Sequence, residues 1–525
     1  MREEKDLADR ISTSNLYNDT FNLVNIKPSR AAGTSGESTA RDYLLKRFVE
    51  VGLKNVHFEP FRYSLWKPLR YIVKFVSPDV GEINGRPMIG SGNTPNDGIT
   101  AEVIYVGDGT KEDYARFSPS ELRGKIHLCS NVVVRNTERI AKYWNAYDNG
   151  ARAFLIFHDV DLHEEGKTPL REGGYASHPI GLPFFHATPL PKAGKLPLWS
   201  LPGVAISNRD GLKILEMLKK GSVIMNIVLK AKTEEATSWN VIGEIPGETK
   251  DFVTFTSHYD NVTYDDTMHF QGASDNATAC ACCIEIARIF SGVKKPHRSI
   301  RFISFGVEEQ GLYGSFNYVI DHLKEIREHC KLAINIDIIG LKEIHGRQSL
   351  FSMNLYPKEL TPLIKDICKI YDFEHKSYAQ IYFPERNDYT SDHFPFTFLG
   401  NVPSTWMRSI PDMYYHSEYD TIDTIDFEEM KHQLAIHTIL LHKITEPSSA
   451  SISIPSPQTP EMFSVPKFLG HLYALPFYER AMRIVSEITP AVQPIVTSMR
   501  DRLLIFDVLK ILEKYFPPKL IGVPE

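Results

Sequence analysis

The amino-acid sequence predicts an α/β protein that carries an inserted α+β domain and a helical C-terminal extension. Apolar strands alternate with helices through residues 236–446, which favours a mostly parallel sheet flanked by helices. Short β-rich runs broken by Gly and Pro fill residues 66–235. A chain of 525 residues is too long for a single hydrophobic core, so we expect two or three domains.

The first 65 residues are predicted to be helical. Ser, Thr and Glu residues that favour a helix start precede a run with apolar residues at helical spacing. These apolar residues are Tyr43, Leu44, Phe48 and Val51. We assign residues 1–65 and 236–446 to one discontinuous domain.

Residues 66–235 are predicted to form the insert. Its strand and turn segments include "AEVIYVGDG" and "ARAFLIFHDV", with a helical run between Asn136 and Asn149. Four histidines of the insert lack the spacing of metal ligands, so we interpret them as ordinary surface residues. They are His158, His163, His178 and His186.

Three short apolar segments after residue 236 are predicted to be strands, namely "FVTFTS", "SIRFISFG" and "LAINIDIIG". Between the first two, residues Asn276–Phe290 have apolar side chains at the spacing of a helix. In a sheet built this way, functional groups gather at the carboxyl ends of the strands.

Residues 447–525 are predicted to be a Ser/Pro-rich linker followed by helices. The segment "LLIFDVLKIL" has more apolar residues than packing on one side would use. We therefore expect this extension to contribute to a homo-oligomer.

The formal net charge of −6 argues against nucleic acid or an anionic membrane as a partner. The charged amino terminus lacks the apolar stretch of a signal peptide, and no run approaches the ~20 apolar residues of a membrane helix. The six cysteines include no C-x-x-C pair, which argues against a structural Cys₄ zinc site. We expect a cytoplasmic protein with reduced thiols.

Acidic and histidine residues stand at the ends of the predicted strands. Asp275 precedes a helix, where Asp is usually an N-cap, and Glu308 and Glu309 taken alone would be a solvated turn. Asp337 lies inside an apolar strand, where a charge is costly unless it is paired or bound to a metal. Because the carboxyl ends of parallel strands lie at the same edge of a sheet, we expect these acidic and histidine residues to lie close together in space. They are His258, Asp260, Asp275, Glu308, Glu309, Asp337 and His416.

This mixed set suits zinc, for which imidazole nitrogen and carboxylate oxygen are both good ligands. Asp260, two residues after His258, is placed to hold the second ring nitrogen of that histidine. Glu308 and Glu309 are adjacent, so on an extended chain their side chains point to opposite sides. One of them can then bind a metal while the other acts without being coordinated.

Five motifs in chain order carry a resemblance to a known family. H-x-D, G-A-x-D-N, E-E-x-G-L-x-G-S, N-x-D-x-x-G and Y-H-x-x-x-D-T lie between Asn240 and Thr424. The pattern resembles the co-catalytic dizinc exopeptidases, which include bacterial leucyl-type aminopeptidases, glutamate carboxypeptidase and the transferrin receptor. The resemblance implies a three-layer zinc exopeptidase fold, and the insert resembles the protease-associated domain found in several members.

The resemblance also implies two zinc ions per chain, although manganese or cobalt would accept the same ligands. One zinc would be bound by His258 and Asp337, and the other by Glu309 and His416. Asp275 would bridge both ions.

Further roles follow from the same resemblance. Glu308 would be the general base that takes a proton from a water shared by the metals and passes it to the leaving amine. Tyr415 matches a tyrosine that hydrogen-bonds the oxyanion in relatives. Asp420 either orients His416 or starts the next turn, and His393 is expected behind the metals or facing the substrate.

The leading interpretation is an aminopeptidase that acts on peptides. A carboxypeptidase of the glutamate-carboxypeptidase type shares all the metal ligands, and its architecture also resembles this chain. A glutaminyl cyclase would use a single zinc. A receptor-like binding protein without catalysis is disfavoured because the ligand set and the base are complete.

Overall fold

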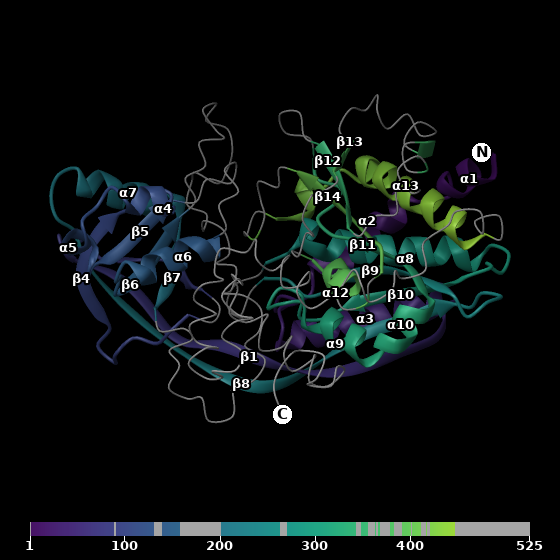
Figure 1. The fold of residues 1–525 in the computed structure, drawn as a ribbon, viewed down its shortest axis with the longest axis horizontal. Helices are drawn as coiled ribbons and strands as arrows, with labels where there is room; N and C mark the ends of the chain where they lie inside the picture. Colours follow the sequence, from purple (N-terminus) through teal and green to yellow (C-terminus); the bar gives the residue numbers. More distant parts are fainter. Residues whose placement is uncertain are drawn as a thin grey trace, which may run out of the picture. The chain divides into compact units, whose positions relative to one another are not determined.

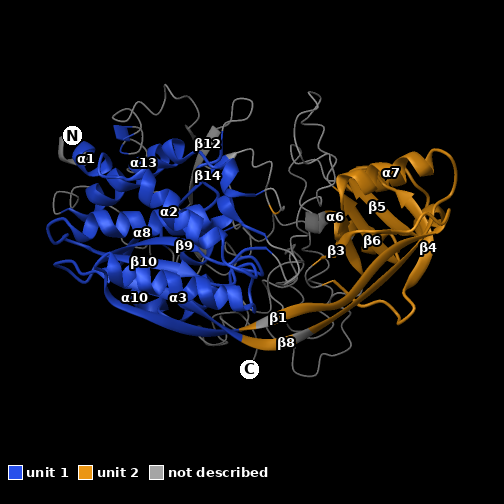
Figure 2. Ribbon diagram, turned by 180° about the vertical axis from the view of Figure 1, so that it is seen from behind, with its two compact units in different colours: residues 1–62, 237–415, 420–462 blue, residues 63–236, 416–419, 463–525 orange. Residues whose placement is uncertain are grey.

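The computed structural model describes most of the chain as two compact units (Figure 1). Unit 1 comprises Met1–Arg62, Thr237–Tyr415 and Asp420–Met462, and unit 2 comprises Tyr63–Ala236, His416–Tyr419 and Phe463–Glu525 (Figure 2). The described residues are 2–88, 91–130, 139–157, 201–262, 270–342, 348–354, 363, 366–367, 379–382, 391–398, 400, 402–410, 416 and 420–446. The predicted linker and helical extension, residues 447–525, lies outside them.

Unit 1 begins with three helices, α1 (Arg2–Ala8), α2 (Thr13–Val24) and α3 (Ser35–Glu50). The side chains of the residues before α2 and α3, a serine and a threonine, accept hydrogen bonds from the first turn of each helix. The prediction that the first 65 residues are helical is wrong after Glu50, because strand β1 (Lys54–Ser77) starts there. Pairing of β1 with strand β8 (Ile224–Ile245), a contact distant in sequence, decides this conformation.

The sheet of unit 1 has a parallel centre and antiparallel flanks (Figure 1). Strands β14, β11, β9 and β10 run parallel in that order, and β8 pairs antiparallel with β10 while β12 pairs antiparallel with β14. This arrangement confirms the predicted mostly parallel α/β sheet. The strand bounds are β9 Phe252–His258, β10 Ser299–Phe305, β11 Cys330–Ile336, β12 Gln348–Asn354, β13 Ala379–Tyr382 and β14 Ser404–Ile410.

Helices cover both faces of this sheet, which gives three layers. On one face, Phe255 of β9 contacts the ring of His437 in α13. Its neighbour Thr256 points to the other face, where it bonds Asn335, which in turn bonds Ser391 just before α12. The helices that follow the first three in this unit are η3 Ala273–Ala277, α8 Thr278–Ser291, α9 Tyr313–Asp321, α10 Leu323–His329, α12 His393–Phe398, η4 Ile422–Thr424 and α13 Phe427–Thr445.

Helix α8 supplies much of the core. Twelve of its residues are buried, and they include the three cysteines of the "CACC" stretch. All five cysteines in the described part of the chain are buried free thiols. They act as small core residues, as the sequence predicts.

Unit 2 contains a second sheet with helices, which confirms the α+β character of the insert. Its strands β4, β5, β6 and β7 run parallel, β3 pairs antiparallel with β7, and β4 pairs antiparallel with β8. The predicted helical run appears as α6. The four insert histidines lie outside the described residues. The bounds are β2 Glu82–Ile83, β3 Gly85–Pro87, β4 Ile99–Tyr105, α4 Lys111–Tyr114, α5 Pro119–Leu122, β5 Ile126–Ser130, α6 Arg139–Asp148, β6 Ala153–Phe157, β7 Gly203–Ile206 and α7 Asn208–Leu218.

Among the described helices, none combines the length and the apolar character that crossing a membrane requires.

Candidate metal centre

The predicted site residues stand where three neighbouring parallel strands end. His258 is the last residue of β9 and lies opposite Phe305, the last residue of β10. Glu308 and Glu309 follow β10 within four residues, and Asp337 directly follows β11. Because β11, β9 and β10 are adjacent, their ends bring these side chains to one edge of the sheet.

His258 lies at the centre of the cluster and is buried. Its Nε2 atom is 3.3 Å from Oδ1 of Asp275 and 3.3 Å from Oδ1 of Asp337. The same nitrogen is 3.9 Å from Oε2 of Glu308. Three carboxylate side chains from separate segments therefore converge on one imidazole.

Two groups of three side chains have the spacing of a metal site. His258, Asp275 and Glu309 form one group, and His258, Glu308 and Asp337 form the other; in each, the ligand atoms lie within 4.8 Å of one another. The adjacent glutamates thus belong to different groups, although they lie in a turn after β10 and not on an extended strand. Which of the two binds a metal and which acts as the base stays a prediction.

The turn before these glutamates has a strained backbone. Val307 has a φ of 55°, in the left-handed region that a β-branched residue rarely adopts. At Gly306 a Cβ atom would meet Oγ of Ser238 at 2.7 Å and the hydroxyl of Tyr259 at 2.8 Å. Such outliers persist where the surroundings impose them, and they cluster at functional sites.

Asp260 holds this turn in place. Its carboxylate accepts hydrogen bonds from the backbone N–H of Glu308 at 3.0 Å and of Glu309 at 3.1 Å. The Nδ1 atom of His258 is 3.2 Å from the backbone oxygen of Asp260 and 3.7 Å from its carboxylate. The residue predicted to orient His258 therefore also positions both glutamates.

Asp275 is not the N-cap of α8, because the cap position is Ala277 and Asp275 itself has non-helical dihedral angles. The backbone N–H groups of Ser274 and Asp275 donate to the carboxylate of Asp420 at 2.7 and 3.0 Å. Asp420 was expected to orient a histidine or to start a turn. In the structure it holds the segment that carries Asp275.

Asp337 is held by a chain of buried polar side chains that the sequence prediction did not link. Ser391 donates to Oδ2 of Asp337 at 2.7 Å, Asn335 donates to Ser391, and Thr256 donates to Asn335. Thr256 and Asn335 are polar residues inside otherwise apolar strands, and this was the sequence signal for the chain of hydrogen bonds. Only the tertiary fold shows that they bond each other. His393 is fully buried and its ring stacks on Trp406.

The site carries an excess of negative charge. Burial raises the pKa of Glu308 well above its usual range, and neighbouring carboxylates add to this effect. Burial also raises the pKa of Glu309, with the Asp275 carboxylate next in importance. Burial alone would lower the pKa of His258, but the carboxylates of Glu308 and Asp337 raise it well above its ordinary value. A bound cation would relieve this repulsion between carboxylates.

His416 is a predicted ligand that belongs to neither of the two groups found among the described residues. His416 is buried, has a φ of 56° and falls in unit 2 of the chain. Tyr415 lies outside the described residues. Their roles as ligand and as oxyanion partner remain predictions.

The donor set fits a zinc centre. Imidazole nitrogen with several carboxylates is a combination that zinc accepts, and these side chains are all buried. His258, Asp275, Glu308, Glu309 and Asp337 are the residues of the described part whose spacing would let them hold a metal.

Family models match both parts of the chain. The model described as Peptidase family M28 matches residues 240–438, the region that contains every candidate ligand. Residues 240–438 belong to peptidase family M28. The PA domain model matches residues 99–214, so the M28 region of this chain has a PA domain insert.

Curated proteins that are similar to this chain include aminopeptidases and a carboxypeptidase. Aminopeptidase YwaD of Bacillus subtilis is 28% identical over 65% of this chain, and Leucine aminopeptidase 2 of Arthroderma otae is 26% identical over 61%. Human Carboxypeptidase Q is 26% identical over 58%. The alignments cover 66%, 56% and 61% of these relatives' own lengths, which is less than two thirds of each.

Solved structures share the M28 fold of this chain. A zinc aminopeptidase from Bacillus subtilis matches with a TM-score of 0.63 at 22% identity, covering 83% of this chain and 96% of that one. An aminopeptidase from Aneurinibacillus sp. strain AM-1 matches with a TM-score of 0.57 at 24% identity, covering 85% of this chain and 96% of that one. These likenesses confirm the predicted fold.

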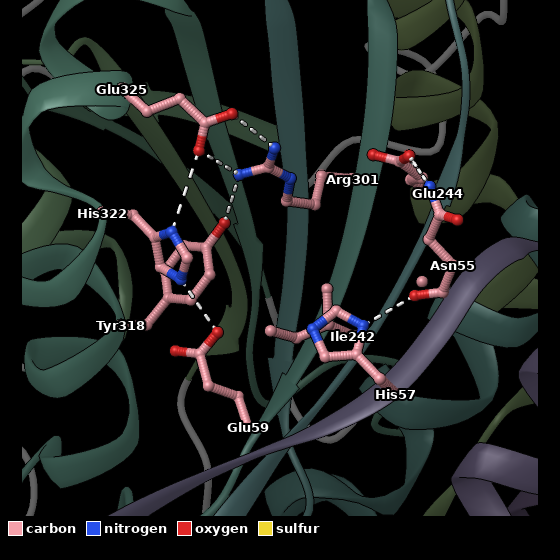
Figure 3. Close-up of a pocket in the computed structure, with 10 residues that line it drawn as sticks. Asn55, His57, Glu59, Ile242, Glu244, Arg301, Tyr318, His322 and Glu325 are labelled. Atoms are coloured by element: carbon pink, nitrogen blue, oxygen red, sulfur yellow. Dashed lines mark hydrogen bonds and ion pairs between the residues drawn. The ribbon is translucent and has the colours of Figure 1, made fainter.

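A separate cavity of about 210 Å³ lies in unit 1 beside β1, β8 and β10 (Figure 3). Arg301 forms an ion pair with Glu325 at 2.9 Å, and His322 contacts Glu59 at 2.8 Å. Asn55 donates a hydrogen bond to another lining carboxylate, Glu244. The charged groups that line this cavity are thus matched with polar neighbours inside it, so their charges do not specify a ligand.

Proposed function

We propose that this chain is a zinc-dependent exopeptidase, and most specifically an aminopeptidase that removes amino-terminal residues from peptides. The observation that carries the proposal is the buried cluster around His258, in which two triads share one imidazole inside the M28 region. A parallel sheet supports such a site at the carboxyl ends of its strands.

When bound, the metal ions would polarise the scissile carbonyl and make a water nucleophilic at neutral pH. Glu308 would take the proton from the attacking water and deliver it to the leaving amine, because its carboxylate faces the cluster. Asp260 keeps this carboxylate in place through the backbone of the turn. The burial of these side chains strengthens their electrostatic contacts.

The choice between the two substrate termini is part of the proposal. Both aminopeptidases and Carboxypeptidase Q are among the relatives, and two of the three relatives described above are aminopeptidases. The decisive assay compares aminoacyl-anilides that have a free amine with peptides blocked at the amino terminus, with and without a chelator. Cleavage of free-amine substrates alone supports an aminopeptidase, and cleavage of the blocked peptides refutes it in favour of a carboxypeptidase.

The number of metal ions separates the remaining alternatives. We propose two zinc ions per chain, with His416 completing the second site. Metal analysis of zinc-saturated protein that gives one ion would favour a glutaminyl cyclase. Two ions without hydrolysis of any peptide would favour a receptor-like protein.

We also propose that the chain is cytoplasmic and that residues 447–525 contribute to a homo-oligomer. Light scattering on a chain truncated after Pro447 tests the second point. An unchanged subunit number in the truncated protein would refute it.

A further inference from the structure

Arg30 is a buried arginine that lies between α2 and α3, outside every motif of the metal centre. Its side chain is 1% exposed. Each hydrogen bond that its guanidinium donates in the described part of the chain goes to a backbone carbonyl. The acceptors are Leu23 O at 3.0 Å, Tyr259 O at 3.0 Å, Gln271 O at 2.7 Å and Gly272 O at 2.8 Å.

Three of these carbonyls, those of Tyr259, Gln271 and Gly272, belong to the segments that carry two candidate ligands. Tyr259 directly follows His258, and Gly272 lies three residues before Asp275. The rigid fork of the guanidinium therefore joins the end of β9 to the start of η3, two segments that no strand pairing connects.

The backbone around Gly272 is shaped to admit this side chain. Gly272 has a φ of +53°, and a Cβ atom there would meet Asp275 O at 2.5 Å and Nη2 of Arg30 at 3.1 Å. Only a glycine leaves room for the guanidinium to approach the segment of Asp275 so closely.

Arg30 brings a positive charge close to the excess negative charge of the site. A buried cation bonded only to carbonyls costs free energy unless opposite charges lie nearby. Burial lowers the pKa of Arg30, while the carboxylates of Asp420, Asp260 and Asp275 oppose that effect. Arginine stays protonated in proteins, so one positive charge remains behind the carboxylates of the centre.

Asp260 and Asp420 also hold the backbone next to the candidate ligands. Asp260 accepts the backbone N–H groups of Glu308 and Glu309, and Asp420 accepts those of Ser274 and Asp275. Carboxylates thus hold amides, and the guanidinium holds carbonyls, immediately behind the candidate ligands.

We propose that Arg30 is a positioning residue of the metal centre, which sets the spacing of His258 and Asp275 and offsets the negative charge of the site. This inference rests on the proposed function only in requiring that the cluster binds zinc. Its failure is therefore measured by zinc affinity, whereas the failure of the peptidase proposal is measured by turnover.

The test uses the full chain and zinc itself, with affinity measured by competition against a chromophoric chelator. Arg30→Gln should weaken zinc binding by about 10- to 100-fold, the usual effect of removing a residue that orients metal ligands. Arg30→Lys keeps the positive charge but lacks the planar guanidinium, so its zinc affinity should fall less than that of Arg30→Gln. Arg298→Gln is the matched control, because Arg298 also donates to a backbone carbonyl, at the opposite end of β10 from the site.

A purely structural role would give a different result. In that case Arg30→Gln would lower the unfolding temperature of the metal-free protein and leave its zinc affinity within about twofold of wild type. That outcome in a variant with native near-UV circular dichroism overturns the proposal. If Arg30→Gln does not fold, Arg30→Lys decides: an affinity equal to that of Arg298→Lys refutes the proposal, and a weaker one supports it.

Discussion

Replacing Asp260 by asparagine tests whether this residue positions the two glutamates of the site. In the wild type its carboxylate accepts two buried N–H groups, at 3.0 and 3.1 Å. An asparagine keeps one acceptor oxygen and turns an NH₂ group toward the other amide, so one buried donor loses its partner. The backbone oxygen that contacts Nδ1 of His258 is unchanged, so the ring of that ligand keeps its nearer contact.

The magnitude follows from the lost hydrogen bonds. An unsatisfied buried N–H costs about 1–3 kcal/mol, and the remaining bond loses the extra strength of a charged acceptor. We expect about 3 kcal/mol in total for Asp260→Asn, which corresponds to a roughly 100-fold decrease in kcat/KM if the displaced turn misplaces Glu308.

The assay measures kcat/KM of zinc-saturated protein on a leucine anilide, together with urea unfolding. Asp113→Asn is the matched control, because the Asp113 carboxylate accepts the backbone N–H of Thr110 at 3.2 Å in unit 2. That variant should lose about 1 kcal/mol of stability and keep its activity. An Asp260→Asn enzyme whose kcat/KM and stability both equal those of wild type would refute the reasoning.

Three further predictions concern charge. Glu308→Gln should bind zinc normally and lose about 10²- to 10⁴-fold in kcat, whereas Glu309→Gln should also bind zinc more weakly; equal metal loss in both, by metal analysis, contradicts the assigned roles. Burial raises the pKa of Glu37 to about 7, above its unfolded value, so the folded chain holds an extra proton and stability should fall as the pH rises from about 4.5 to 7. Glu37→Gln should flatten this slope in urea titrations at several pH values, and an unchanged slope counts against the buried carboxyl as its source. The hydrogen bond to Glu59 raises the pKa of His322, so this pair stabilises the fold below the unfolded pKa of about 6.5 and loses its effect as the pH rises through the folded value. Because the pair is partly exposed, His322→Gln should remove only a few tenths of a kcal/mol at pH 6 and nothing at pH 9.

Much of the fold was predictable because its signals are local. Apolar runs such as Phe252–Ser257 and the helical spacing of Asn276–Phe290 reflect which side chains a strand or a helix buries. The strand that starts at Lys54 was missed because its conformation comes from pairing with a strand some 170 residues later in the chain.

The candidate ligands were also predictable, and the contacts that support them were not. His258, Glu308, Glu309 and Asp337 are polar residues at or just after strand ends, so parallel topology predicts that they converge, whereas Asp275 lies in η3 before α8. The N-cap interpretation of Asp275 is excluded only by the dihedral angles and by the cap at Ala277.

By itself, the sequence determined the sheet, the insert and the residues that meet at the carboxyl edge, because periodicity and chain order encode these properties. The tertiary structure alone decided how they are held. Arg30 bonds carbonyls more than 220 residues away, and Asp420 bonds amides about 145 residues away. Backbone acceptors and donors exist at every residue and leave no mark on the sequence, so only folding selects which of them a buried side chain will reach.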